Sequence, residues 1–211
     1  MSNVLEQKKS EVKGSTSLEH YTERDRIHDQ LIPHLSGETL LRCGSELGLV
    51  RDGELTLPFP EADQFLWEYC LYFDRGDENT PSTPPIQEYC RQNTASQTTA
   101  LIKAMAKAEF ALLEVEECGS TSTILCSDFL TGTTRSIFDP RLSKAVNPGN
   151  LIPTMIFSAE CRSDFYTSGG YLILAEEEIE QVHRALGQFP KRVLPPHEAA
   201  KFVQSIAQIL F

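Results

Sequence analysis

The chain has 211 residues and a net charge of −11, because 19 Lys and Arg stand against 30 Asp and Glu. Domains average about 150 residues, so this length makes one large domain or two small ones. The 12 Gly and 12 Pro are close to the average share, which excludes collagen-like and low-complexity chains. The acidic balance argues against a protein that mainly grips nucleic-acid phosphates and against attachment to an anionic membrane surface.

We expect neither a secretory signal nor a membrane span in this sequence. No apolar run follows the first charges, and no stretch approaches the ~18 consecutive apolar residues of a membrane helix. The cysteines form no C-x-C or C-x-x-C pair, which excludes a zinc knuckle and a thioredoxin-type site; they are Cys43, Cys70, Cys90, Cys118, Cys126 and Cys161. We interpret them as free thiols and expect a cytoplasmic protein without a metal or a cofactor.

The first half of the chain is predicted to be helical after a polar start. Residues 1–22 lack an apolar face and are predicted to form a disordered or loosely held tail. Residues 23–108 are predicted to form a helical region. Its most apolar helix, at about 61–74, carries aromatic residues all round, which indicates burial on more than one side.

The pattern changes at Glu109, where apolar and acidic residues begin to alternate as in a half-buried strand. Residues 109–174 are predicted to form five short strands separated by turns, with a kink in the last strand at Ser168-Gly-Gly170. Five short strands favour a small, closed or nearly closed barrel, because closure removes exposed edges. The predicted fold is therefore α+β, with an N-terminal helical region, a five-stranded antiparallel barrel-like sheet and C-terminal helices.

Residues 175–211 are predicted to form C-terminal helices that pack on the rest of the chain. The final helix, about 197–210, has an apolar face that continues to the end of the chain; its candidate partner-binding residues are Phe202, Val203, Ile206, Ile209, Leu210 and Phe211. This face must pack on something. We favour docking on the same domain, and the alternative is a partner protein or a second copy of the chain.

Several segments together resemble a family of uncharacterised bacterial proteins in which a helical region precedes a small β-domain, often with a SEC-C zinc motif at one end. The resemblance covers about residues 40–180 and is clearest in Asp128-Phe-Leu-Thr-Gly132, in Leu142-Ser-Lys-Ala-Val-Asn-Pro-Gly149 and in Ser168-Gly-Gly-Tyr171. The cysteine and histidine pairs of the SEC-C motif are absent from this chain, so the zinc role does not carry over. The resemblance implies a fold but no activity.

No catalytic signature is present in the sequence. The glycines form no nucleotide-binding loop, and neither G-x-S-x-G nor H-E-x-x-H occurs. His28 and His34 are six positions apart, which suits no metal pair, and we interpret both as solvated surface residues. Glu61 and Asp63 could bind a cation or act as acid and base, but acids near a helix start more often serve the helix dipole.

Three hypotheses about function follow. The leading one is a non-enzymatic protein-interaction or adaptor protein. The second is a nucleic-acid-binding module that uses an OB-type barrel; nucleic acid is the less expected partner, because the barrel has few basic residues to gather on one side, namely Arg135, Arg141, Lys144 and Arg162. The third is an enzyme with an unrecognised acidic site, which a deep pocket of convergent carboxylates would favour.

Overall fold

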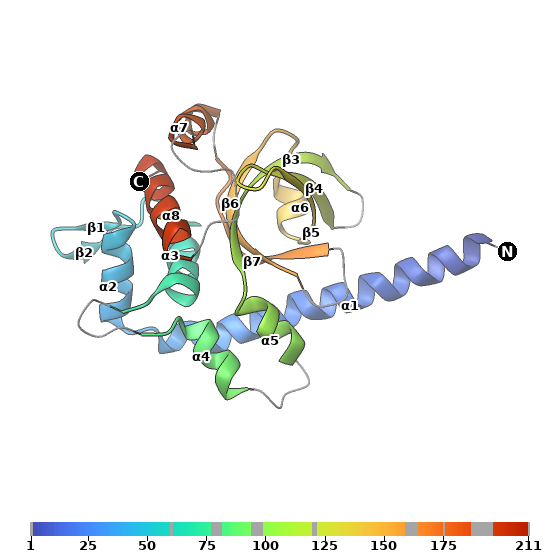
Figure 1. The fold of residues 1–211 in the computed structure, drawn as a ribbon, viewed down its shortest axis with the longest axis horizontal. Coiled ribbons are helices and arrows are strands. Elements are labelled where there is room, and N and C mark those ends of the chain that lie inside the picture. The colour runs from blue at the N-terminus through green and yellow to red at the C-terminus, as the bar shows by residue number, and fades with distance from the viewer. Residues whose placement is uncertain are drawn as a thin grey trace.

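A computed structural model describes residues 2–59, 61–76, 82–93, 99–119, 122–158, 164–174, 176–186 and 196–210. Helices lie against one side of a small β-barrel, and a long N-terminal helix runs along it (Figure 1). The α-helices are α1 (Ser2–Leu31), α2 (Gly37–Glu46), α3 (Glu61–Phe73), α4 (Pro85–Gln92), α5 (Thr99–Met105), α6 (Leu142–Ala145), α7 (Glu176–Leu186) and α8 (Pro196–Leu210), with a 3₁₀ turn at Ile32–His34. The predicted α+β class is confirmed. None of the described helices is long and apolar enough to cross a membrane.

The first helix, α1, begins at Ser2, within the segment for which a disordered or loosely held tail is predicted. From Ser17 onward one side of the helix is buried, through Ser17, Tyr21, Arg24 and His28. These residues are three or four positions apart, as one helical face requires. Three of the four carry polar side chains, so hydropathy alone does not reveal the face.

A small hairpin follows α2, made of β1 (Val50–Arg51) and β2 (Glu54–Leu55). Asp52 and Gly53 connect the two strands with φ angles of 53° and 84°. Positive φ at both positions is typical of a type I′ turn, for which Asp-Gly is a preferred pair.

The barrel consists of β3 (Glu109–Cys118), β4 (Thr123–Asp128), β5 (Thr133–Phe138), β6 (Leu151–Phe157) and β7 (Asp164–Tyr171). The five strands close in the order β3-β4-β5-β7-β6, with β6 paired to β3. The expected purely antiparallel sheet is wrong, because β5 and β7 are parallel, with Ile137 opposite Phe165. The segment through α6 carries the chain from β5 to the far side of β3, so β7 returns beside β5 in the same direction.

Two hydrophobic clusters hold the molecule together. One fills the barrel and includes Leu113, Ile137 and Ile152, with Leu142 and Val146 at and just after α6 closing one end. The other is larger and joins the helices to the outside of the barrel, with members on α3, on β3 and on α8. The helical region and the barrel therefore share one continuous core.

Buried polar groups attach β7 to the helices. Arg24, whose side chain is 1% exposed, donates to the carbonyl oxygen of Thr167 at 2.8 Å and lies 3.7 Å from Asp139. Glu68 on α3 accepts hydrogen bonds from the Ser168 hydroxyl and from the Gly170 N–H. Burial raises the pKa of Glu68 to about 8, although both hydrogen bonds oppose the shift.

Gly169 and Gly170 let the helices approach β7 closely. Gly169 has a φ of +113°, and a Cβ atom there would lie 3.3 Å from the Arg24 guanidinium. A Cβ on Gly170 would lie 2.6 Å from the Glu68 carboxyl carbon. The predicted irregularity at these glycines thus coincides with a close contact between the helices and the barrel.

Candidate anion-binding site at the barrel mouth

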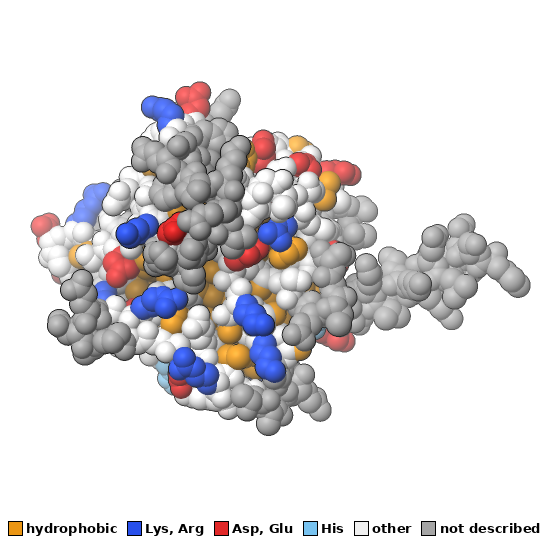
Figure 2. Space-filling view, viewed as in Figure 1, with side chains coloured by type: hydrophobic (Ala, Val, Ile, Leu, Met, Phe, Trp, Pro, Cys, Tyr) orange, Lys and Arg blue, Asp and Glu red, His pale blue; other side chains and the backbone are white. Residues whose placement is uncertain are grey.

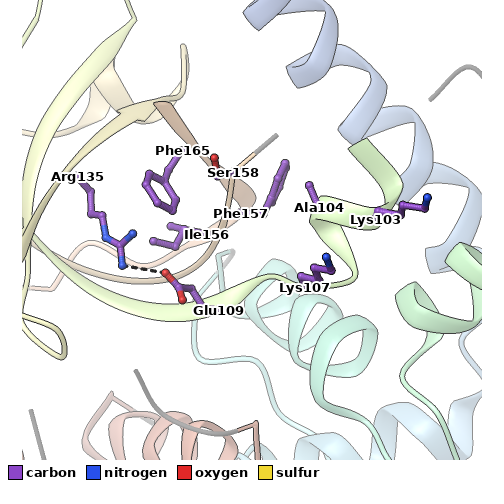
Figure 3. A pocket seen from close by; sticks show the side chains of 9 residues that line it. All are labelled: Lys103, Ala104, Lys107, Glu109, Arg135, Ile156, Phe157, Ser158 and Phe165. Atoms are coloured by element: carbon purple, nitrogen blue, oxygen red, sulfur yellow. Dashed lines mark hydrogen bonds and ion pairs between the residues drawn. The ribbon is translucent and has the colours of Figure 1, made fainter. Parts of the chain in front are cut away.

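A hollow of about 380 Å³ lies where the open end of the barrel meets the C-terminal end of α5 (Figure 3). Its lining combines two lysines, an arginine and a glutamate with apolar and aromatic side chains; the residues are Lys103, Ala104, Lys107, Glu109, Arg135, Ile156, Phe157, Ser158 and Phe165. Small-molecule pockets have volumes of about 300–1,000 Å³ and include the mouths of β-barrels. We therefore treat this hollow, the barrel mouth, as the candidate functional site.

The strand pattern explains why charged side chains line the barrel mouth. Alternate residues of a strand face the same side, and Ala111 and Ile137 belong to the cluster inside the barrel. Glu109 and Arg135, two positions away on β3 and β5, therefore continue the inward-facing rows at the end opposite α6. A charged group is tolerated at this position because it reaches the opening.

Arg135 is held by several contacts. Its Nη2 donates to Glu109 Oε1 at 2.9 Å and lies 3.8 Å from Asp128 Oδ2. Its guanidinium lies 4.4 Å from the centre of the Phe165 ring, which is a cation–π contact. The side chain is 16% exposed, and its buried Nε finds no hydrogen-bond partner within the described residues. Arg135 is thus a positioned, incompletely satisfied cation.

Glu109 balances part of this charge. Burial raises the pKa of its carboxyl group, while the Arg135 guanidinium acts in the opposite direction. Only Oε1 is engaged with Arg135, and within the described part of the chain Oε2 accepts no hydrogen bond. Because an ionised carboxylate has about four lone-pair positions, Glu109 can still accept hydrogen bonds from a ligand.

Lys103 and Lys107 come from the helical side of the barrel mouth. Both are exposed, and neither forms an ion pair with any residue that the structure describes. Leu101, Ile102 and Met105 bury the other side of α5 and so fix the direction of the lysines. Lys103 lies on α5 and Lys107 in the turn that follows it, and both line the hollow.

The local charge of the barrel mouth is opposite to that of the whole molecule. Three cationic side chains and one carboxylate line the hollow, whereas the chain carries −11. On this face several Lys and Arg side chains lie around exposed hydrophobic side chains (Figure 2). A basic rim around an apolar floor suits an organic anion, because it offers charge to one end of the ligand and dispersion contacts to the other.

A larger hollow of about 630 Å³ beside β7 has a different character. Its charged lining residues are Glu61, Glu178 and Arg141. Arg141 already donates to Asp25 at 3.3 Å. This hollow therefore lacks a surplus of positive charge, and we do not assign it a ligand.

The candidate residues of the final helix lie mostly inside the molecule. Phe202, Val203 and Ile206 are each 1–2% exposed and belong to the cluster that joins helices and barrel, and Phe202 meets Phe110 edge-on at 5.7 Å. Ile209 is half-buried, and the side chains of Leu210 and Phe211 lie outside the described residues. The described part of this face docks on its own chain.

The four barrel cations considered from the sequence do not gather on one side. Arg135 lies at the barrel mouth, whereas Arg141 and Lys144 lie at the opposite end with α6, and Arg162 is outside the described residues. Lys103 was missed as a partner of Arg135 because it precedes the barrel in the sequence. Two lysines four positions apart just before the first strand were the available signal.

The acidic residues that the structure describes do not gather into a metal-binding cluster. Asp63 lies in the first turn of α3 with Glu61, and Asp74 is paired with Arg42 at 2.8 Å. No group of three or more His, Cys, Asp and Glu that could hold a metal occurs among the described residues.

The expectation of a solvated His28 is wrong. Its ring is buried, with Nε2 3.0 Å from the hydroxyl oxygen of Tyr72. Burial, with help from the nearby Arg24, lowers the pKa of His28 to about 3, so the ring is neutral at pH 7. His28 is a residue of the helix–barrel interface.

The strand order and the parallel β5–β7 pair define a closed, five-stranded mixed barrel, with α6 between β5 and β6 and helices against one side. Residues 16–191 match the Family of unknown function (DUF7986), so the chain belongs to that family. No similar protein was found among the curated proteins or among the solved structures. The expected membership of an uncharacterised family is thus confirmed.

Proposed function

We propose that the protein is a binding module for a small organic anion, which it takes up in the barrel mouth. The observation that supports this proposal is that Lys103, Lys107 and Arg135 line the same partly apolar hollow, in a chain of opposite net charge. The two lysines are exposed and have no described ion-pair partner, so a ligand does not have to displace a carboxylate from them.

The apolar floor restricts the kind of anion. Ile156 and Phe157 are buried beneath the hollow, and the ring of Phe165 forms part of its wall. An inorganic anion would leave the partly exposed ring of Phe165 in water, whereas a ligand with a planar apolar part would cover it. The favoured ligand therefore carries both an anionic group and an aromatic ring.

The volume and the surrounding charge favour a small ligand over a nucleic-acid strand. OB barrels bind oligonucleotides across the face that includes their second and third strands, which are β4 and β5 here. Next to that face β3 carries Glu114, Glu116 and Glu117, and β7 begins with Asp164. These carboxylates repel a phosphate backbone, so the nucleic-acid alternative lacks an electrostatic footprint.

The interpretation as a protein-interaction or adaptor protein stays a prediction. The surface first considered for it, the apolar face of α8, is mostly covered by the chain itself. The cytoplasmic location and the relation to proteins with a SEC-C motif also stay predictions.

The proposed function can be tested with 1-naphthyl phosphate, an aromatic anion that is small enough for the barrel mouth. Isothermal titration of the full chain should show saturable binding, while 1-naphthol and inorganic phosphate should each bind at least about tenfold more weakly. The double variant Lys103→Glu, Lys107→Glu should lose most of this affinity. Lys144→Glu with Lys201→Glu is the matched control, since both lysines are exposed and lie outside the barrel mouth. Equal binding by the two double variants would contradict the proposal.

A further inference from the structure

We infer that the anion taken up in the barrel mouth is a guanine mononucleotide, with its phosphate at the two lysines and its base against Phe165 and Glu109. This inference rests on the proposed function and adds the class of ligand. It comes from the two unlike ends of the hollow: Arg135, Phe165 and Glu109 lie on one side, and Lys103 and Lys107 lie on the other (Figure 3).

Glu109 is the residue that distinguishes this site from a general anion site. One oxygen of this carboxylate pairs with Arg135, and the other is left over in a hollow that would repel a purely anionic ligand at this end. Glu109 lines the hollow, and its Oε2 has no hydrogen-bond partner among the described groups. A ligand with N–H donors at the end that enters the barrel therefore gains hydrogen bonds to Oε2, in addition to the contacts of its anionic group.

Guanine fits this requirement best among the nucleobases. It presents two adjacent N–H donors, at N1 and at the 2-amino group, and a carboxylate can accept both. Adenine and cytosine each present one amino group next to an acceptor nitrogen, which a carboxylate repels. Proteins read unstacked bases by hydrogen bonds to this edge and by stacking on aromatic rings such as Phe165.

Arg135 is a positioning residue in this arrangement. Its bond to Glu109 Oε1 fixes the carboxylate and leaves Oε2 for the ligand. Its guanidinium covers one face of the Phe165 ring, which fixes that ring as well. The two groups that would contact the base are therefore already in place before a ligand binds, which lowers the entropic cost of binding.

A free mononucleotide is favoured over the end of a nucleic-acid strand. The hollow of about 380 Å³ is near the lower limit for small-molecule pockets. A strand leaving it along β3 would pass Glu114 and Glu116, and along β7 it would meet Asp164. Each additional phosphate would be repelled there.

Isothermal titration of the full chain with guanosine, inosine and adenosine 5′-monophosphates tests the inference. Guanosine monophosphate should bind at least about tenfold more tightly than the other two. The base of inosine lacks the 2-amino donor, and the base of adenosine has an acceptor at N1 in place of the N–H donor. Glu109→Gln should remove this preference, since the side-chain amide replaces one acceptor oxygen by a donor. Glu114→Gln, on the same strand but outside the hollow, is the control and should keep it.

The outcomes separate the inference from the proposed function. Equal affinity for the three nucleotides, together with tight binding of 1-naphthyl phosphate, would overturn the guanine inference and leave the anion site standing. Failure of all these anions to bind would overturn both. Tighter binding of a guanosine-ended hexanucleotide than of the mononucleotide would overturn the preference for a free nucleotide. The comparison of nucleotides on the unchanged chain holds even if Glu109→Gln fails to fold.

Discussion

The carboxyl group of Glu68 lies between α3 and β7, and its pKa of about 8 has a direct consequence for stability. A carboxyl group whose pKa is raised in the folded state stabilises the fold below its ordinary pKa of about 4.5. This contribution is lost as the pH rises towards 8, because the unfolded chain ionises first. Around the carboxyl lie Arg24, His28 and Tyr72 from the helices and Asp139 from the barrel side; His28 stays neutral here.

Glu68→Gln should therefore change the pH dependence of stability. Between pH 5 and pH 8.5 the free energy of unfolding of the unchanged chain should fall, relative to the variant, by roughly 3–5 kcal/mol. Urea unfolding at both pH values measures this difference. Glu61→Gln is the control, because Glu61 is exposed in the first turn of the same helix. If the free energy of unfolding changed with pH equally in Glu68→Gln and in the unchanged chain, the raised pKa of Glu68 would be contradicted.

Gly170 is the second residue at which packing makes a sharp prediction. A methyl group there would overlap the Glu68 side chain, with contacts of 2.6–2.9 Å. Gly170→Ala should destabilise the protein by about 1–3 kcal/mol in urea unfolding. Gly37→Ala should be neutral or slightly stabilising, because Gly37 begins α2 and a Cβ atom there meets nothing within 4 Å. Similar losses in the two variants would show that the contact with Glu68 is unimportant.

Among the elements, α8 shows what a sequence pattern can predict and what it cannot. The spacing of its apolar residues predicts a buried face, and the structure places Phe202, Val203 and Ile206 in the core. The spacing does not reveal which surface covers this face, because a surface of the same chain and a surface of a partner protein would make the same kind of apolar contact. The covering surface, which includes Phe110, lies about ninety positions earlier in the sequence.

Phe202→Ala should cost about 3–5 kcal/mol of stability, as expected for a buried aromatic side chain. Gln208→Ala, at an exposed position of the same helix, should change stability by less than about 0.5 kcal/mol. Light scattering should give the same mass for both variants and the unchanged chain. A lower mass for Phe202→Ala without loss of stability would instead favour a face that binds a second chain.

The strands of the barrel were predictable individually, but their arrangement was not. Alternating apolar residues indicate β3, and turn residues separate the other strands. The parallel pairing of β5 with β7 depends on how the segment through α6 crosses the barrel, which no local pattern encodes. The barrel mouth could not be predicted for a similar reason, because Lys103 and Arg135 come from elements of different type.

At the scale of the whole molecule, the shared core makes the helical region and the barrel one cooperative unit. The larger cluster contains Leu66 on α3, Leu112 on β3 and Phe202 on α8. Trp67, the only tryptophan, lies beside Leu66 and therefore reports on the helical region. The predicted boundary between residues 23–108 and 109–174 thus marks a change in the sequence pattern. It does not separate two cores, because side chains from both sides of it pack together.

Urea unfolding should accordingly give one transition with every probe. The midpoint from Trp67 fluorescence should coincide with the midpoint from far-ultraviolet circular dichroism, which also reports the strands. A fragment of residues 109–174 should fail to fold, because it lacks the helices that cover the outside of its barrel. Separate midpoints, or a folded fragment, would show two independent domains.

The bond between Arg24 and Thr167 joins positions 143 residues apart. During synthesis from the N-terminus, α1 leaves the ribosome long before β7 exists. Arg24 therefore stays exposed to water until the next 143 residues have been made, and only then can it be buried against Thr167. Contacts of such long sequence separation slow folding. Until β7 has been made, the nascent chain therefore exposes the side of α1 that is later buried, including the apolar Tyr21 and Ile27.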